Sequence, residues 1–310
     1  MGYDAALGPE YVYSHARAFS RHEAFRLVAG IDPDAGRREH WTLAFGCPAS
    51  ADLADALEQH RPDVVVIAVP TPLHAGVLET VLAGPLPKAV LCEKPLSYDA
   101  GEGARMVDAC AAAGIALYVN YMRRSDAAAI EIRRRIMAGE MGAAIKGVAW
   151  YSKGFIHNGS HFFNLCEYWL GPMQDAAVIA AGRSWAGIDP EPDVRVRFAG
   201  GEVVFLAAWE EAFSHYTVEL LSTSGRLRYD RGGEQVDWQP ADAGALGAPQ
   251  RIASGMDRYQ WHVAAQLARA LDHQPAEICT GGSALATLQA MSLINARIDG
   301  FDRAHRGIPT

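Results

Sequence analysis

Short, unbroken apolar segments alternate with helical segments through the first 120 residues. The apolar segments cover residues 25–31, 63–69, 88–92 and 115–119. Continuous apolar runs of about four to eight residues are typical of parallel strands that are buried on both faces. Between and around them, residues 9–20, 35–45, 51–60, 74–83 and 99–113 are predicted to be helices. This alternation predicts an α/β fold with a Rossmann-like, doubly wound parallel sheet.

The pattern changes after Asn120. We expect helices at 127–138, 161–170, 259–271 and 283–299, and strands at 145–151, 194–198, 203–209, 216–222 and 226–229. Gly200-Gly201 is expected to join two of these strands as a hairpin. Consecutive strands without helices between them predict a C-terminal α+β domain with a large, open, mostly antiparallel sheet. The predicted domains are residues 1–121 and 122–310.

Composition excludes several classes of protein. Half of the 310 residues are hydrophobic, yet no apolar run reaches the roughly 20 residues that a membrane span needs. The net charge of −8 argues against nucleic acid as the main partner. The five cysteines are scattered and never spaced as CxxC, which favours a reduced, cytoplasmic protein without disulfides or structural zinc.

The chain is expected to begin inside a phosphate-binding turn. If Gly2 is the second glycine of GxGxxA, Ala5 is the third position, and the first strand of the sheet is missing. Asp32 ends the next apolar run, where a carboxylate can accept a ribose hydroxyl and favour NAD over NADP. Arg37 and Arg38 weaken that preference, so NADP stays possible. The alternatives are that Gly2 is an ordinary terminal residue and that Asp32 caps a helix.

Glu93-Lys94-Pro95 directly follows a predicted buried strand. A lysine at that position can donate to a substrate hydroxyl or orient a nicotinamide ring, and burial can adjust its pKa. Pro95 can lock a turn, including one with a cis peptide bond. The tripeptide by itself favours the alternative, an ordinary surface lysine in a turn.

Further motifs occur in order around this tripeptide. Pro70-Thr71-Pro72-Leu73-His74 precedes it by one βα unit, Asn120-Tyr121-Met122-Arg123 follows it by another, and Gly159-Ser160-His161 opens a later helix. The ordered set resembles the Gfo/Idh/MocA family of nicotinamide-dependent sugar and polyol dehydrogenases. The resemblance implies an N-terminal Rossmann domain, and a C-terminal domain that binds substrate and whose open sheet supports a homodimer or homotetramer.

The resemblance also implies roles for individual residues. Lys94 corresponds to the lysine at the active centre, between Glu93 and Pro95, which shape its backbone. Pro70, Thr71 and His74 fall where the family contacts the cofactor, and Asn120 and Arg123 fall near the nicotinamide. His161 corresponds to the histidine of an Asp-x-x-x-His motif, which accepts a proton or positions the substrate.

The motif around His161 departs from the family pattern. His157 stands where the aspartate is expected, and Asn164 replaces an acidic residue often found three positions after the histidine. His161 nevertheless starts a largely apolar helix, whose dipole disfavours an imidazolium, so a neutral proton acceptor is expected. A histidine satisfied by the backbone is the alternative. His157 and His161 are also spaced to share a metal on a helix, but no third ligand is evident.

Two functions are compatible with these residues. The first is an NAD(H)-dependent oxidoreductase that moves a hydride between nicotinamide and a hydroxyl-bearing carbon of a sugar or polyol. Lys94, His161 or His157 then accepts the hydroxyl proton. The second is a catalytically inactive relative that binds a dinucleotide or sugar as a sensor. The replacements at His157 and Asn164 and the incomplete glycine turn keep this second hypothesis open.

Overall fold

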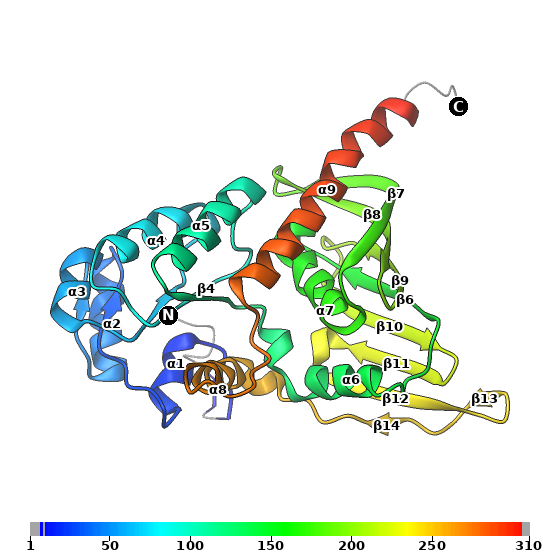
Figure 1. Cartoon of the computed structure of the whole chain (residues 1–310), viewed down its shortest axis with the longest axis horizontal. Helices are drawn as coiled ribbons and strands as arrows, with labels where there is room; N and C mark the ends of the chain where they lie inside the picture. The colour runs from blue at the N-terminus through cyan, green and yellow to red at the C-terminus, as the bar shows by residue number, and fades with distance from the viewer. Residues whose placement is uncertain (1–6, 9, 306–310) are drawn as a thin grey trace. The chain divides into compact units, whose positions relative to one another are not determined.

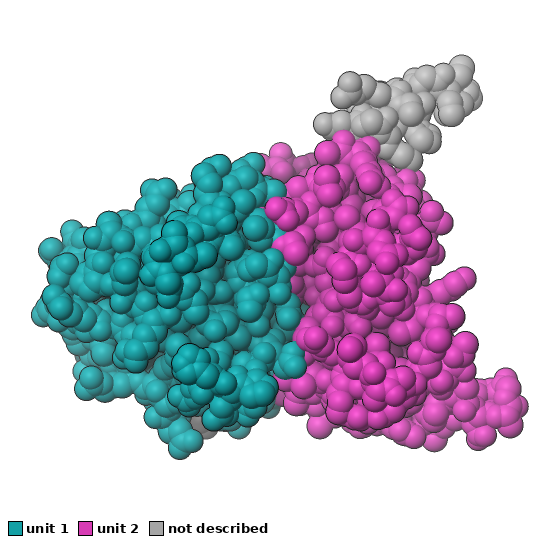
Figure 2. All heavy atoms as spheres, viewed as in Figure 1, with its two compact units in different colours: residues 1–125, 257–285 teal, residues 126–256, 286–310 magenta. Residues whose placement is uncertain are grey.

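We analysed a computed structural model of the chain (Figure 1), which describes residues 7–8 and 10–305, with side chains up to residue 298. The chain divides into two compact units (Figure 2): unit 1 contains residues 7–125 and 257–285, and unit 2 contains 126–256 and the remainder of the C-terminal helix. The division differs from the predicted boundary at residue 121, because residues 257–285 pack with unit 1. Gly2 lies outside the described residues.

Unit 1 contains a Rossmann-like parallel sheet, which confirms the predicted fold class. Strands β3 (Val64–Ile67), β4 (Ala89–Cys92) and β5 (Ala116–Val119) are parallel, in the order β3-β4-β5. Every residue of β4 is buried, as expected for the central strand of the three. Two further strands, β1 (Gly30–Ile31) and β2 (Ala49–Ser50), form a separate parallel pair. The prediction of a strand over residues 25–29 is wrong, because Phe25 and Leu27 contribute their side chains to a core cluster without pairing their backbone.

The helices of unit 1 are α1 (His15–Arg21), α2 (Ala35–Phe45), α3 (Leu53–His60), α4 (His74–Ala83), α5 (Ala100–Ala112) and α8 (Tyr259–Leu271). Four of them, α1, α2, α3 and α5, begin after a residue whose side chain caps them. The side chains of Asp34, Asp52 and Asp99 each accept a hydrogen bond from the backbone N–H three residues later. Gly46 ends α2 with a left-handed backbone conformation, at φ 65°. These caps explain why the predicted bounds of α2 are confirmed.

Among the described residues, unit 1 has two clusters of buried apolar side chains. Residues 257–285 belong to unit 1 because their apolar side chains complete the second core cluster, which also contains side chains of α1 and β4. Val263 and Leu267 of α8 pack with Phe19 of α1 and Leu91 of β4. The backbone of Val12 also donates a hydrogen bond to Asp257 and accepts one from Gln260. Sequence patterning identified α8 correctly but had no means of assigning it to a sheet whose last strand, β5, ends 140 residues before α8 begins.

Unit 2 is built on one nine-stranded mixed sheet. The strands are β6 (Ile145–Tyr151), β7 (Met173–Trp185), β8 (Asp189–Phe198), β9 (Gly201–Ala207), β10 (Thr217–Ser222), β11 (Gly225–Asp230), β12 (Gln235–Asp242), β13 (Ala245–Leu246) and β14 (Gln250–Arg251). Their order is β13-β12-β11-β10-β6-β9-β8-β7, with β14 also on β12. Only β6 and β9 pair in parallel, and β8 and β9 form the predicted hairpin. The prediction omitted β7, which register shifts interrupt, and β12 to β14.

One face of this sheet is covered by helices α6 (Ala127–Met137) and α7 (Ser160–Leu170) (Figure 1). Every residue of α7 except Glu167 is buried, which is typical of a helix that is apolar around its circumference. Phe163 packs edge-on against Phe198 of β8 and also contacts Phe205 of β9. The last helix, α9 (Gly281–His305), starts in unit 1 and continues into unit 2. The sheet therefore holds α7, and with it His161, in a fixed position.

Candidate active site

The carboxyl ends of the three parallel strands of unit 1 place most of the predicted site residues at one edge. Cys92, the last residue of β4, pairs with Ile67 of β3 and with Val119 of β5. Glu93 donates its backbone N–H to Ile67 at 2.9 Å, and Asn120 donates its own to Cys92 at 2.8 Å. Ligands of open α/β sheets bind at this edge. The register therefore brings Glu93 and Asn120 together, as the sequence predicted.

Glu93 is the centre of a hydrogen-bond cluster. Its Oε1 accepts from Asn120 Nδ2 and lies 2.7 Å from His15 Nε2, and its Oε2 accepts from the backbone N–H of Lys94 at 3.2 Å. Burial would raise the pKa of Glu93, but the hydrogen bonds and charge of His15, the Asn120 amide and the nearby Lys94 outweigh it and lower the pKa to about 2. Glu93 is therefore an ionised acceptor at neutral pH.

His15 is a member of this cluster that the sequence analysis missed. It is the first residue of α1, behind the N-cap Ser14, and its side chain is 16% exposed. Its partner Glu93 lies 78 residues further along the chain. No local pattern links the two positions, because the contact depends on how α1 packs in the second core cluster.

Lys94 and Pro95 form the turn that follows β4. The Lys94–Pro95 peptide bond is cis and Pro95 is buried, whereas Lys94 is partly exposed. The charge of Lys94 contributes to the low pKa of Glu93. The turn thus places the charge of Lys94 near the ionised carboxylate of Glu93 at the ligand-binding edge. Its role in the reaction stays a prediction.

The other predicted cofactor residues of unit 1 differ in what they can offer a ligand. His74 is fully buried, and its two ring nitrogens lie 3.1 and 3.0 Å from the carbonyl oxygens of Leu96 and Val69. It thereby ties the turn after β4 to the segment after β3. Thr71 is buried at the start of a short helix, and Pro70 before it is exposed. Arg123 is buried in the 3-10 turn Met122–Ser125. Contact of these four residues with a cofactor stays a prediction.

Asp32 follows β1 and is partly exposed. Its Oδ1 accepts the backbone N–H of Asp34 at 2.9 Å, and its Oδ2 lies 3.5 Å from Arg37 Nη1. Arg38 instead donates to the backbone carbonyls of Asp32 and Pro33. The N-cap of α2 is Asp34, not Asp32. The Asp32 carboxylate thus retains capacity for a ribose hydroxyl, next to a cation that can also face a phosphate.

In unit 2, His161 is the second residue of α7 and lies behind a π-helical turn, Gly154–Gly159. The imidazole is buried. Asn164 donates to Thr287 at 2.9 Å, and Thr287 donates to Glu167. The position where the family carries an acidic residue is therefore bonded to α9. His161 keeps its helix-start position, as predicted, and its catalytic role remains a prediction.

The predicted site residue His157 lies on the same turn. Its ring stacks on Trp185 of β7, with centroids 4.7 Å apart and planes 20° apart. Its backbone N–H donates to Asp189 Oδ2 at 2.6 Å. Among the described residues, no group of three or more His, Cys, Asp and Glu side chains is arranged to hold a metal ion.

Two buried carboxylates that the sequence analysis overlooked hold this turn in place by accepting hydrogen bonds from its backbone. Asp189 accepts the backbone N–H groups of Ile156 and His157, and Glu191 accepts that of Gly154 at 3.0 Å while pairing with Arg183 at 2.5 Å. A Cβ at Gly154, whose φ is 80°, would collide with the Asp189 carboxylate. Two acidic residues with alternate spacing at the start of a strand are the signal that was available.

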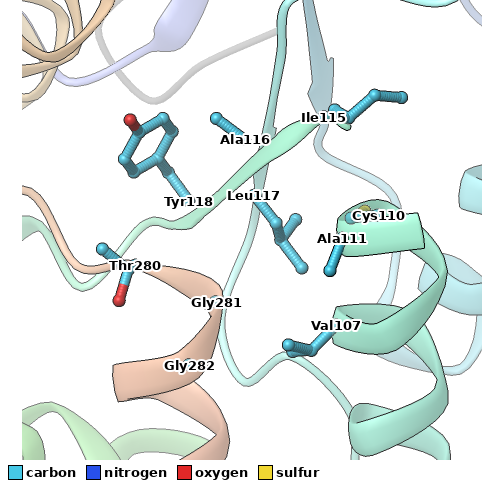
Figure 3. Close-up of a pocket in the computed structure, with 10 residues that line it drawn as sticks. All are labelled: Val107, Cys110, Ala111, Ile115, Ala116, Leu117, Tyr118, Thr280, Gly281 and Gly282. Atoms are coloured by element: carbon cyan, nitrogen blue, oxygen red, sulfur yellow. The ribbon is translucent and has the colours of Figure 1, made fainter. Parts of the chain in front are cut away.

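Figure 3 shows a pocket of about 260 Å³ in unit 1, at the β5 edge of the parallel sheet. Val107 and Cys110 of α5 face Leu117 of β5 there, with Thr280 and Gly281 at the start of α9. The lining is mostly hydrocarbon, and the pocket lies along the side of β5 rather than at the carboxyl ends of the strands. It is therefore not a candidate for the cofactor site.

The fold and these groups define a two-unit α/β protein with a Rossmann-like unit that carries a Glu-Lys-Pro turn. Residues 8–121 match the family model GFO_IDH_MocA, described as an oxidoreductase family with an NAD-binding Rossmann fold. That part of the chain is similar to the Gfo/Idh/MocA oxidoreductase family, as the resemblance implied.

Individual relatives agree with this assignment. Inositol 2-dehydrogenase 4 of Saccharopolyspora erythraea is 37% identical over 128 residues, which are 41% of this chain and 37% of that protein. The scyllo-inositol 2-dehydrogenase (NAD(+)) of Bacillus subtilis is 34% identical over 131 residues, covering 42% of this chain and 36% of that protein. The sequence matches thus span less than half of these relatives.

The fold likeness extends over nearly the whole chain. An NAD binding oxidoreductase from Klebsiella pneumoniae superposes with a TM-score of 0.79 and covers 95% of this chain and 94% of that chain. The two sequences are only 17% identical, so this likeness shows the fold alone. It includes the mixed sheet of unit 2, for which the family model gives no match.

Proposed function

We propose that this protein is an NAD-dependent oxidoreductase that transfers a hydride between nicotinamide and a hydroxyl-bearing carbon of a polyol or sugar. The observation that carries the proposal is the ionised Glu93, held by His15 and Asn120 and followed by Lys94, at the strand ends of an NAD-binding family domain. The relatives named as inositol 2-dehydrogenases make a cyclic polyol the first substrate to test.

The residues present fit a nicotinamide dinucleotide. Asp32 supplies a carboxylate for a ribose hydroxyl. Arg37, whose Nη1 lies 3.5 Å from Asp32 Oδ2, provides a positive charge that can bind the 2′-phosphate of NADP. Buried Asn120 has an oxygen, Oδ1, without a hydrogen-bond partner among the described residues. When bound, the cofactor supplies the hydride chemistry.

The chain's own residues supply orientation and proton transfer. Lys94, beside the fixed charge of Glu93, donates to the substrate hydroxyl and holds it in place. On oxidation the hydroxyl loses its proton to a histidine of unit 2, His161 or His157, or to Lys94 in its neutral amine form, because the ammonium form can only donate. The buried carboxylates Asp189 and Glu191 fix the turn that carries His157, because they accept hydrogen bonds from its backbone N–H groups.

The setting of the protein completes the proposal. The five cysteines are all free, four of them buried, which favours a reducing cytoplasm. Within the described residues, no helix combines the length and the apolar character that crossing a membrane requires. The open face of the unit 2 sheet carries apolar side chains such as Ile179 and Leu221 that are about half exposed, which supports assembly as a homodimer or homotetramer.

The comparisons give no support to the alternative of a catalytically inactive sensor, because the matching relatives are named as dehydrogenases. The deciding experiment is a titration of the protein with NADH, followed by assays of NAD⁺ reduction with inositols, other polyols and aldoses. We expect micromolar binding of NADH and turnover with at least one cyclic polyol. Binding without turnover on any substrate would favour the sensor, and absence of NADH binding would overturn the proposed NAD-dependent oxidoreductase.

A further inference from the structure

The loop between β9 and β10, residues 208–216, is fastened to the segment that precedes the π-helical turn of His157. Ser152 Oγ accepts a backbone N–H of the loop at 3.3 Å, and Lys153 Nζ lies 3.3 Å from Glu210 Oε1. Because Lys153 is the residue directly before the turn, these contacts hold the loop beside a candidate site residue.

Trp209 of this loop is held in place and is nevertheless exposed. The Arg183 guanidinium lies 5.3 Å from the centre of the indole ring, and Arg183 Nη2 donates to the carbonyl oxygen of Ala208 at 2.8 Å. Arg183 is itself paired with the buried Glu191 at 2.5 Å. Trp209 remains 71% exposed. One exposed apolar side chain is ordinary, but an indole ring that a cation already holds can stack on a ligand with little further loss of conformational freedom.

The fold places this ring beside the stacked pair that contains His157. Arg183 and Trp185 are alternate residues of β7, and their partners in β8 follow the same alternation without a register shift. Side chains at alternate positions of a strand project from the same face, roughly 7 Å apart. Trp185 stacks on His157, and Arg183 stacks on Trp209. The spacing of these two stacks is comparable to the length of one hexose ring.

The charges around the indole ring are paired with one another. Lys153 pairs with Glu210, and Arg183 pairs with Glu211, so an anionic ligand would have to displace an ion pair. Glu210 also accepts the hydroxyl of Ser214 at 3.0 Å, which shows that a hydroxyl can bind to this carboxylate. A hexose ring has an apolar C–H face and a rim of hydroxyls. It therefore matches an indole face that is bordered by carboxylates.

We propose, resting on the function proposed above, that Trp209 is a stacking platform for a second, uncharged hexose ring. The preferred substrate is then a glycoside of a polyol or sugar rather than the free compound. Its first ring, which carries the reacting hydroxyl, lies at the turn of His157, and the ring linked to it extends to Trp209. Trp209 determines specificity in this scheme and takes no part in hydride or proton transfer.

The test compares free and glycosylated substrates. The polyol or sugar that is turned over best is assayed beside its α- and β-glucosides and galactosides, beginning with myo-inositol. We expect the wild-type protein to give a kcat/KM roughly tenfold higher for at least one glycoside, through a lower KM, because the second ring gains the contact with Trp209. Trp209→Ala should make free and glycosylated compounds equal, and Trp209→Phe should retain part of the preference.

A matched control is Ile188→Ala, because Ile188 is 72% exposed in the turn between β7 and β8 and has no part in the proposal. It should retain the preference. Saturation-transfer NMR of the same glycosides, with NADH present, gives a readout that does not need turnover. The C–H protons of the second ring should receive saturation from the wild-type protein and lose it in Trp209→Ala.

The possible results separate this proposal from the function on which it rests. Equal kcat/KM for free and glycosylated compounds in the wild-type protein overturns it, as does an undiminished preference in Trp209→Ala. A change of oligomeric state in Trp209→Ala, measured by light scattering, would assign Trp209 to a contact between copies of the chain and also overturn it. If no free or glycosylated compound is turned over, the proposed function fails, and the NMR contact alone decides the role of Trp209.

Discussion

Glu93 in unit 1 and Asp189 in unit 2 are carboxylates that accept hydrogen bonds from candidate site residues, but the donors differ in kind. Side chains of His15 and Asn120 approach Glu93, and their hydrogen bonds with the charge of Lys94 outweigh burial and lower its pKa to about 2. Asp189 is bonded to backbone N–H groups of one turn. Burial, with the repulsion of Glu191, outweighs those bonds and raises the pKa of Asp189 above its ordinary value.

The difference shows what each carboxylate is able to organise. A side-chain donor such as Asn120 has a second polar atom that it can present to a ligand. A backbone N–H has no second polar atom of its own, so Asp189 fixes the shape of the turn and nothing beyond it. We infer that Glu93 orients ligand-binding side chains, whereas Asp189 fixes the backbone turn that carries His157. Four experiments test this contrast, beginning with the largest expected effect.

Substitution of Lys94 tests whether the residues around Glu93 take part in the chemical step. Lys94→Ala should lower kcat by roughly 10²- to 10⁴-fold, the usual contribution of a positioned acid–base group, with little change in Tm. The measurement is steady-state turnover with the best polyol substrate. Lys88→Ala, at the exposed opposite end of β4, is the control and should behave as the wild type. Unchanged turnover in Lys94→Ala would remove Lys94 from the mechanism.

Asp189→Ala tests the framework role in unit 2. The variant leaves the buried N–H groups of Ile156 and His157 without acceptors, so the free energy of unfolding should fall by about 2–4 kcal/mol. Urea denaturation measures this loss. Asp189→Asn keeps one acceptor oxygen and avoids a buried charge, so it should cost less. The interpretation is wrong if Asp189→Ala is no more damaging than a control at exposed Asp242.

Glu93→Gln tests the origin of the low pKa. Because the folded pKa of about 2 lies below the ordinary 4.5, the unfolded chain binds the proton first as pH falls. The stability that Glu93 contributes, roughly 1–3 kcal/mol, is present above pH 4.5 and is lost as pH falls toward 2. Glu93→Gln should be less stable at pH 7 and flatter over this acidic range. Parallel stability curves for the two proteins would contradict the assigned shift.

Asp32→Ala tests the expected ribose contact, which involves neither Glu93 nor Asp189, and should have the smallest effect. Removing the carboxylate and leaving Arg37 should shift the ratio of NADH to NADPH affinities toward NADPH by about tenfold. Fluorescence titration with both cofactors measures the ratio. Asp34→Ala, which removes a helix cap but no expected ribose contact, is the matched control. An unchanged NADH affinity in Asp32→Ala would exclude the ribose hydrogen bond.

Much of the fold was accessible from local pattern. Apolar runs located β3 to β5, and the bounds of α2, α4, α8 and β6 agree with the expected ranges. The same patterns placed Glu93, Lys94 and Asn120 at strand ends that the parallel register brings to one edge. Patterning failed at residues 25–29, which are apolar because they pack and not because they pair, and at β7, whose register shifts break the alternation.

Local sequence patterns specify most of the strands and helices and the polar residues that follow the strands, because these depend on periodicity and on caps within a few residues. The contact of His15 with Glu93, and the support that Asp189 and Glu191 give to the turn of His157, depend instead on the packing of distant elements. Those contacts join positions 78 and more than 30 residues apart. They exist because helices and strands pack their apolar faces together, and no short-range pattern records which faces will meet.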